Sequence, residues 1–283
     1  MSIAVTGATG QLGRIVIEKL KQRTATSSIL ALARKPEQAE SLGVVARAFD
    51  YSEAEMQDAA LSGVGTLLLI SSSEIGQRAA QHTNVIAAAK RAGVRRVVYT
   101  SVLHADVSVL ALADEHRATE AALKASGLPY TLLRNGWYTE NYTGFVGMAL
   151  ANGALLGSAG AGQISSATRE DLAEAAAVVL TAEGHENMTY ELVGDTSWTL
   201  SDLTAEISRQ SGKDIRYRDL PEAEYAAVLE GAGLPRGLAA ALASYDASAS
   251  QGALYGNERD LTELIGRSTT TLFVSVERAL AAL

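Results

Sequence analysis

The sequence of 283 residues contains no cysteine, which excludes disulfide bonds, thiolate nucleophiles and cysteine-ligated metals and fits a reducing compartment. No apolar run approaches the roughly 20 residues of a membrane-spanning helix, and the N-terminus lacks the basic region and long apolar stretch of a cleaved signal. The formal net charge of -8 does not favour nucleic-acid binding. We therefore expect a cytoplasmic protein that neither inserts into a membrane nor binds nucleic acid.

Several catalytic motifs are also missing. No tyrosine has a lysine four residues further on, although that pair supplies the proton donor in many oxidoreductases. The sequence has neither a G-x-S-x-G nucleophile motif nor a phosphate-binding P-loop. The histidines, His82, His104, His116 and His185, lack the spacing of metal ligands. His104 can reach a cleft and His116 can pair with Glu120, but structural roles are favoured. We predict no metal site and identify no catalytic residue.

The first 134 residues alternate strand-like and helix-like segments. Short apolar runs predict six strands, at residues 3–5, 29–33, 44–46, 66–70, 96–101 and 129–134. Helices are expected between them, at residues 14–21, 36–42, 53–61, 77–92 and 112–126. Because the apolar runs are continuous and helices connect them, the strands should form a parallel sheet covered on both faces. We therefore predict an α/β fold with a doubly wound Rossmann sheet within residues 1–134.

The pattern changes after Arg134. Helical spacing is found at residues 137–150, 169–181, 199–211, 221–231, 234–243, 260–265 and 272–280, and short strands are expected at 189–193 and 215–217. Residues 155–162 form a small, glycine-rich connection. This pattern predicts a smaller mixed α/β lobe over residues 135–283, on the substrate side of the strand ends. Residues 165–195 are expected to pack back onto the first domain.

A glycine-rich turn, GATGQLG at residues 7–13, joins the first predicted strand to the first helix. Gly7 can adopt the backbone angles of a sharp turn, Gly10 lets a pyrophosphate approach, and Gly13 lets the helix pack against the strand. The free amides at the helix start attract phosphates. Glycines also occur in plain turns without a ligand, but this position favours a dinucleotide site.

The end of the second predicted strand distinguishes NADP from NAD. An acidic residue there accepts hydrogen bonds from the ribose 2′-hydroxyl of NAD, whereas a basic residue pairs with the 2′-phosphate of NADP. Here the strand runs into Arg34 and Lys35, and Arg34 offers a guanidinium fork suited to a phosphate. A surface basic pair is the alternative. Asp50, after the third strand, can contact the adenine amine or cap a helix. We predict NADP(H) as the cofactor.

Two further strand ends are expected along the cofactor, because ligands of a doubly wound sheet bind at the carboxyl ends of its strands. The backbone after the fourth strand should follow the nicotinamide ribose, at Ile70, Ser71 and Ser72. In the segment after the sixth strand, Gly136 permits close backbone approach. Trp137 and Tyr138 offer flat faces to a planar ring, or they anchor the second lobe by packing.

Several motifs together resemble one family. They are VTGATGQLG, LLLISSSE, AAAKRAGVRRVVYTS, LADEH, YTLLRNGWYTENY and SATREDLA, with Arg34 at the end of the second strand. Over essentially the whole chain they are similar to the NmrA-like branch of the atypical short-chain dehydrogenases. Within it they most resemble bacterial NAD(P)H:quinone oxidoreductases of type 2, with triphenylmethane dye reductases as near relatives. The glycine motif is common to the wider family, whereas ISSSEIGQR and LRNGWYTENY are more specific.

The resemblance implies NADPH-dependent reduction of quinones. The cofactor contacts it implies are residues 7–12, Arg34, Ile70, Ser71, Ser72, Arg134, Asn135 and Ser166. The quinone contacts it implies are Gly136, Trp137, Tyr138 and Thr139. Some members of the branch bind a dinucleotide and regulate partners without turning over a substrate.

We therefore expect hydride transfer from the nicotinamide directly to a quinone. A quinone accepts hydride readily and gives a stable oxyanion, so a dedicated proton donor is less necessary, in agreement with the missing tyrosine–lysine pair. Two alternatives remain at this point. One is a redox-sensing NADP-binding regulator that acts through a protein partner, and the other is a reductase of conjugated electrophiles such as dyes. The proton source and the oligomeric state are not indicated by the sequence.

Overall fold

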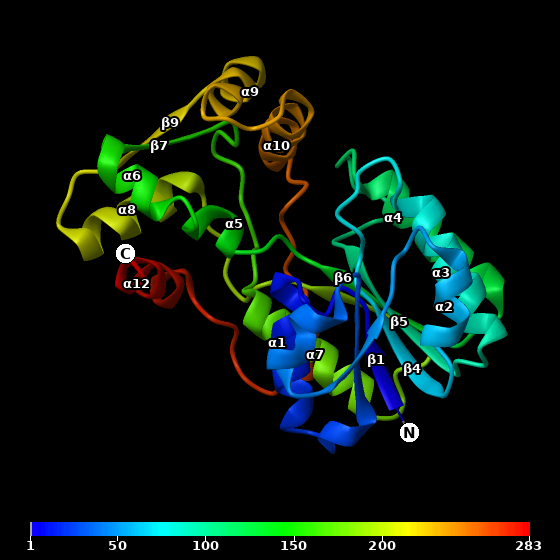
Figure 1. The fold of residues 1–283 in the computed structure, drawn as a ribbon. Helices are drawn as coiled ribbons and strands as arrows, with labels where there is room; N and C mark the ends of the chain where they lie inside the picture. Colours follow the sequence, from blue (N-terminus) through cyan, green and yellow to red (C-terminus); the bar gives the residue numbers. More distant parts are fainter. Residues whose placement is uncertain (1) are drawn as a thin grey trace.

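The computed structural model describes residues 2–283 and contains a sheet of seven parallel strands (Figure 1). Their spatial order is β3-β2-β1-β4-β5-β6-β8. Because the order reverses between β1 and β4, the loops that leave these strands diverge and open a crevice at the carboxyl edge. This confirms the predicted doubly wound parallel sheet. The strands are β1 (Ser2–Val5), β2 (Ile29–Ala33), β3 (Val45–Ala48), β4 (Val64–Leu69), β5 (Arg96–Val102), β6 (Tyr130–Asn135) and β8 (Met188–Leu192).

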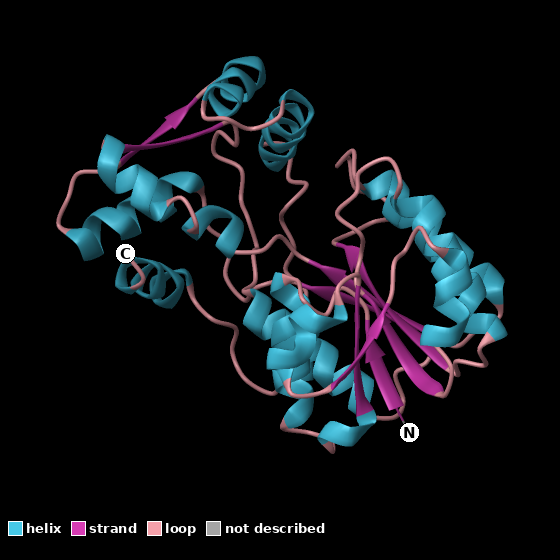
Figure 2. Ribbon diagram, viewed as in Figure 1, coloured by secondary structure: helices cyan, strands magenta, loops and turns pink. Residues whose placement is uncertain are grey.

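Helices cover both faces of this sheet, as Figure 2 shows. In β4, Leu68 packs into the core on one face, whereas Leu67 and Leu69 pack into the core on the other. This double burial explains why the strands are continuous apolar runs. The first face carries α1 (Gln11–Lys21), α7 (Arg169–Thr181) and α11 (Asp260–Ile265), and the second carries α2 (Ala54–Ala60), α3 (Arg78–Arg91) and α4 (Ala113–Ser126). Two 3₁₀ segments, η1 (Thr26–Ser28) and η2 (Pro36–Leu42), flank β2.

The sheet also takes in a strand from beyond the first 134 residues. β8 pairs in parallel with β6, and Thr131 lies opposite Met188 at the start of the register. The preceding helix, α7, shares its core with α1 through side chains such as Val16 and Leu172. The Arg96 guanidinium of β5 donates to the Val179 carbonyl of α7 at 2.8 Å. Helix α7 and strand β8 thus pack on the Rossmann unit.

The remaining elements form a smaller lobe, at the upper left of Figure 1. It contains a two-stranded parallel sheet of β7 (Ala154–Gly157) and β9 (Arg216–Asp219). Its core includes Leu155, Trp198 and Val276, and the predicted mixed α/β lobe is confirmed. Its helices are α5 (Glu140–Thr143), α6 (Val146–Asn152), α8 (Leu200–Ser211), α9 (Glu222–Gly231), α10 (Arg236–Ala249) and α12 (Leu272–Ala281). Among residues 2–283, no helix combines the length and the apolar character that crossing a membrane requires.

The chain after β6 differs from the single helix that the sequence predicts over residues 137–150. The Trp137 carbonyl accepts from the Ala167 amide at 3.0 Å, and the Thr139 amide donates to the Ala167 carbonyl at 3.0 Å. These bonds hold the start of the segment in an extended form, and helix is confined to the short α5 and α6. Helical periodicity does not reveal bonds to a distant segment. Likewise, β7 occupies part of the expected connection at 155–162.

Two histidines belong to a buried polar chain between α3 and α4. His82 Nε2 accepts the Ser72 amide at 2.9 Å, and His116 Nδ1 lies 2.7 Å from the Tyr99 hydroxyl. Because Nε2 of His82 accepts, its proton is on Nδ1 and the ring is neutral. Burial, reinforced by the charge of Arg78, lowers the pKa of both rings to about 3. Both histidines therefore have the structural role expected of them.

These neutral rings predict a loss of stability on acidification. In the unfolded chain a histidine binds a proton below its ordinary pKa of 6.5, whereas folded His116 stays neutral down to about 3. The unfolded state then binds more protons, so each such ring should cost about 1.4 kcal/mol per pH unit below about pH 6. Urea unfolding of the wild type and His116→Gln at several pH values measures this. The variant should lose less stability on acidification by roughly that amount, and equal slopes would contradict the prediction.

Candidate active site

A cleft of about 680 Å³ opens at the carboxyl edge of the sheet, above β1, β2 and β4. The glycine turn after β1 lines one side, and the loop after β4 lines the other. The cleft lies where the strand order reverses, which is where doubly wound sheets bind ligands. Of the residues predicted to bind the cofactor, those that line it are Gly7, Thr9, Gly10, Gln11, Leu12, Arg34, Ile70, Ser71 and Ser72.

The glycine turn brings the N-terminus of α1 close to β1. A Cβ added at Gly13 would lie 2.3 Å from the Gly7 carbonyl oxygen and 2.9 Å from Ala8 Cα, so a side chain there would collide with backbone. Gly7 has a φ of 58°, in the left-handed region that favours glycine. Gly10 is the N-cap of α1, no side chain caps the helix, and its first turn has no acidic residue. The first-turn amides and the positive end of the helix dipole are therefore available to a phosphate.

Arg34 lies at the mouth of the cleft, directly after β2. Its side chain is 71% exposed, and its Nη1 lies 3.5 Å from Glu74 Oε1. Lys35 lines the same part of the cleft. An exposed ion pair of this kind contributes little to stability, so the guanidinium can exchange this carboxylate for a phosphate. The position suits the 2′-phosphate contact that the sequence predicts.

The cleft contains a tyrosine that sequence analysis did not single out. The Tyr51 hydroxyl donates to the Ile70 carbonyl at 2.7 Å and lies 2.8 Å from Thr6 Oγ1. Burial raises the pKa of Tyr51 well above its usual value, so the phenol is neutral and fixes the ends of β1 and β4. Its only signal in the sequence is its place after the third predicted strand. The neighbouring Asp50 lines the cleft and its Oδ1 accepts the Ser52 amide at 2.8 Å, so it caps a turn.

The loop after β4 is held in place by hydrogen bonds between its backbone and side chains of neighbouring elements. The Ser71 amide donates to Thr100 Oγ1 at 2.9 Å, and the Ser72 amide donates to His82 Nε2 at 2.9 Å. The Ser72 carbonyl accepts from Arg78 Nε at 2.7 Å. Three neighbouring side chains thus fix this wall of the cleft before any ligand arrives.

Two residues predicted to bind the cofactor have side chains that point elsewhere. Ala8 is fully buried in the core under α1. The guanidinium of Arg134 pairs with both oxygens of Glu120, at 2.9 and 2.8 Å, and with Asp106 and Glu191, each at 2.8 Å. Three carboxylates therefore occupy its donors. The backbone of either residue is the part that can contact a cofactor, and their role in cofactor binding stays a prediction.

Asn135, at the end of β6, has an unsatisfied acceptor. The residue is 6% exposed, and its Oδ1 is buried without a hydrogen-bond partner among the residues that the structure describes. Buried acceptors of this kind are rare, since each costs free energy unless a donor reaches it.

Gly136 and Thr139 make contacts inside the protein. The Gly136 amide donates to the Leu192 carbonyl at 2.7 Å, and a Cβ at Gly136 would lie 2.9 Å from that oxygen. The close backbone approach at Gly136 therefore joins β6 to β8, and a ligand contact at Gly136 stays a prediction. The Thr139 hydroxyl is buried and lies 2.8 Å from the Ser166 hydroxyl, so one of the two donates to the other. Both contacts join the two parts of the chain.

Trp137 and Tyr138 point in different directions. The Trp137 ring lies 5.6 Å from the Tyr245 ring, edge to face, on the side of the smaller lobe. The Tyr138 ring packs against the core of the sheet, and the Arg169 guanidinium lies 4.2 Å from its centroid. The alternation of side chains in an extended segment causes this divergence. Trp137 thus faces the smaller lobe, whereas Tyr138 anchors that lobe against the sheet.

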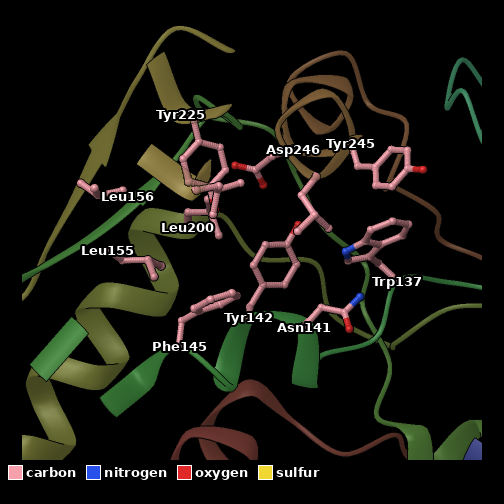
Figure 3. A pocket seen from close by; sticks show the side chains of 12 residues that line it. Trp137, Asn141, Tyr142, Phe145, Leu155, Leu156, Leu200, Tyr225, Tyr245 and Asp246 are labelled. Atoms are coloured by element: carbon pink, nitrogen blue, oxygen red, sulfur yellow. The ribbon is translucent and has the colours of Figure 1, made fainter. Parts of the chain in front are cut away.

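A second, smaller cavity of about 60 Å³ lies beside Trp137 in the smaller lobe (Figure 3). Its walls are mostly aromatic and aliphatic, and sequence analysis did not predict them because they come from α5, β7, α8, α9 and α10. Its polar groups are Asn141, Tyr142, Tyr225, Tyr245 and Asp246.

The fold and the phosphate-suited cleft define a dinucleotide-binding protein. The sequence model of the NAD(P)H-binding family matches residues 7–183. The chain belongs to the NmrA-like NAD(P)H-binding family, as the sequence motifs predicted.

Known relatives match the chain over almost its whole length. Quinone oxidoreductase 2 of Escherichia coli strain K12 is 54% identical over 277 residues, 97% of each chain. The crystal structure of an E. coli NADPH-dependent quinone oxidoreductase complexed with NADPH has a TM-score of 0.96 at 53% identity, over 98% of this chain and 99% of that chain. Citrobacter triphenylmethane reductase complexed with NADP(H) has a TM-score of 0.95 at 40% identity, over 98% and 100% of the two chains.

The crowding at Gly13 predicts a strong effect of one methyl group. Gly13→Ala should lower the free energy of unfolding by about 1–3 kcal/mol, because the added Cβ meets backbone that cannot move aside. Gly237→Ala is the matched control, since nothing lies within 4 Å of a Cβ at that helical position. It should leave stability unchanged or raise it by up to about 1 kcal/mol. Urea unfolding compares the two, and equal effects would contradict the prediction.

Proposed function

We propose that this protein is an NADPH-dependent oxidoreductase that transfers a hydride directly to a quinone. The observation that carries the proposal is the 54% identity to E. coli quinone oxidoreductase 2 over 97% of both chains. The match to an NADPH complex at a TM-score of 0.96 supports the same cofactor.

The residues around the cleft fit NADP(H). The amides at the N-terminus of α1 would hold the pyrophosphate, and Arg34 would hold the 2′-phosphate. The ordered backbone of Ser71 and Ser72 would follow the nicotinamide ribose. When bound, the cofactor supplies the hydride.

The acceptor would lie against Trp137. This ring is only partly buried and lines the second cavity, whereas Gly136, Tyr138 and Thr139 are engaged inside the protein. The Rossmann unit thus holds the cofactor, and the smaller lobe holds the acceptor. Ser166 supports this junction through Thr139. Catalysis would depend mainly on proximity and orientation, because a quinone needs little activation.

A second class of acceptor is favoured by one observation. Triphenylmethane reductase is 40% identical to this chain and has the same fold over 98% of it. Flat conjugated cations could therefore use the same aromatic wall at Trp137. The regulatory alternative predicts tight cofactor binding without turnover.

The choice of NADP over NAD predicts a selective effect at Arg34. Arg34→Gln should raise the NADPH dissociation constant about tenfold or more, since a charge-assisted bond to phosphate is worth roughly 1.5–3 kcal/mol. NADH affinity should change little. Arg216→Gln is the control, because Arg216 is also exposed and paired with a carboxylate, but lies on β9 in the smaller lobe. Fluorescence titration measures both, and an equal loss of NADPH and NADH affinity would contradict the assignment.

The proposed reaction predicts NADPH oxidation with a panel of simple quinones. Turnover should depend on the quinone, and triphenylmethane dyes should be tested in parallel as the second acceptor class. Absorbance at the NADPH band follows the reaction. Tight NADPH binding without turnover of any quinone would overturn the enzymatic proposal and favour the regulator.

A further inference from the structure

The smaller lobe buries a carboxyl group beside the proposed acceptor site. Asp246, on α10, is 7% exposed and lines the same cavity as Trp137. Its Oδ2 accepts the Ser158 amide at 2.5 Å. No lysine or arginine is among the described residues that line this cavity. A carboxyl group in apolar surroundings without a cationic partner favours its protonated form.

The backbone of β7 makes room for this group. A Cβ at Gly157 would lie 2.7 Å from Asp246 Oδ2 and 2.8 Å from Leu200 Cδ1. The carboxyl group can therefore occupy this position only because residue 157 has no side chain. The backbone at Gly157 therefore leaves space for a carboxyl group in a wall that is otherwise mostly apolar.

Tyr142 connects the carboxyl group with the rest of the cavity. Figure 3 shows both side chains projecting into the space that Trp137 also lines, Tyr142 from α5 and Asp246 from α10. The Tyr142 and Asp246 side chains line the same cavity, and burial raises the pKa of Tyr142 well above its usual value. The phenol therefore keeps its proton. The cavity of about 60 Å³ also has room for about two water molecules, at roughly 30 Å³ each.

We propose that Asp246, acting through the Tyr142 hydroxyl, supplies the proton that completes reduction of the acceptor. This inference rests on the proposed function, in which a hydride gives the quinone two electrons and one proton. The remaining proton leaves Tyr142 as its O–H bond breaks and an O–H bond forms on the anionic oxygen of the product. The Asp246 O–H bond then breaks to restore Tyr142. The resulting carboxylate is reprotonated from water.

The surroundings of Asp246 set the pH range of this step. Burial raises its pKa to about 6, and the negative charge of Asp219 adds to the rise, whereas the bonds from Ser158 and Tyr142 act in the opposite direction. The other titratable groups that face this cluster are Tyr217 and Tyr225. Because the protonated carboxyl group is the donor, the rate of proton delivery should fall as the pH rises through this value.

Two variants test the proposal with NADPH and a quinone that the wild type reduces. Asp246→Asn keeps an oxygen for the Ser158 amide but has no acidic proton, and Tyr142→Phe removes the connecting hydroxyl. Each should lower kcat about tenfold or more and alter its solvent deuterium isotope effect, since general acids typically contribute about 10²–10⁴-fold. NADPH affinity should stay within about twofold. Asp214→Asn, at an exposed carboxylate in the same lobe, is the control and should leave kcat unchanged.

A second readout does not depend on turnover. Carbon-13 NMR of aspartate carboxyl groups in the cofactor-free protein should show one resonance that titrates near pH 6 and is absent in Asp246→Asn. A kcat and pH profile unchanged in both variants, or an Asp246 resonance that titrates below about pH 4, would overturn the inference while leaving the quinone reductase intact. If Asp246→Asn does not fold, Tyr142→Phe decides. A wild type that reduces no quinone would instead overturn the proposed function and this inference together.

Discussion

The contact between Gly13 and the Gly7 carbonyl is the constraint on which the rest of the site depends. The space for a Cβ at Gly13 is only 2.3 Å from that oxygen, so α1 can approach β1 only without a side chain there. This approach aims the uncapped N-terminus of α1 into the cleft and lets the helix share a core with α7. The phosphate site and the packing of one sheet face therefore have the same cause.

Two neutral rings help to fix the walls of the cleft. Tyr51 holds the ends of β1 and β4, and His82 holds the loop after β4 through the Ser72 amide. Burial keeps both rings uncharged, by raising the pKa of the phenol and lowering that of the imidazole. Because they are neutral, these two rings order the loops without adding charge to the cleft. The exposed cations Arg34 and Lys35 lie at its mouth.

A short bridge between residues 137–139 and Ala167 determines how the two lobes meet at the proposed acceptor site. It holds the segment after β6 in an extended form, so Trp137 and Tyr138 face opposite ways. One aromatic ring anchors the lobe against the sheet, and the other faces the cavity that Asp246 lines. The cofactor cleft is thus built from one continuous part of the chain, whereas the acceptor side is assembled from five separate elements.

The sequence by itself determined the parallel sheet, the glycine turn, the position of Arg34 at the end of β2, and the family. These features depend on local patterns: apolar runs buried on both faces, a turn that only glycine allows, and the residue that follows a strand. Only the tertiary structure decided the rest. The partners of Arg134 lie on three other segments, the close neighbour of Gly136 is a carbonyl of β8, and the apolar surroundings of Asp246 come from elements distant in the chain. Burial and pairing of a polar side chain are properties of its neighbours in space, and residue spacing along the chain does not encode them.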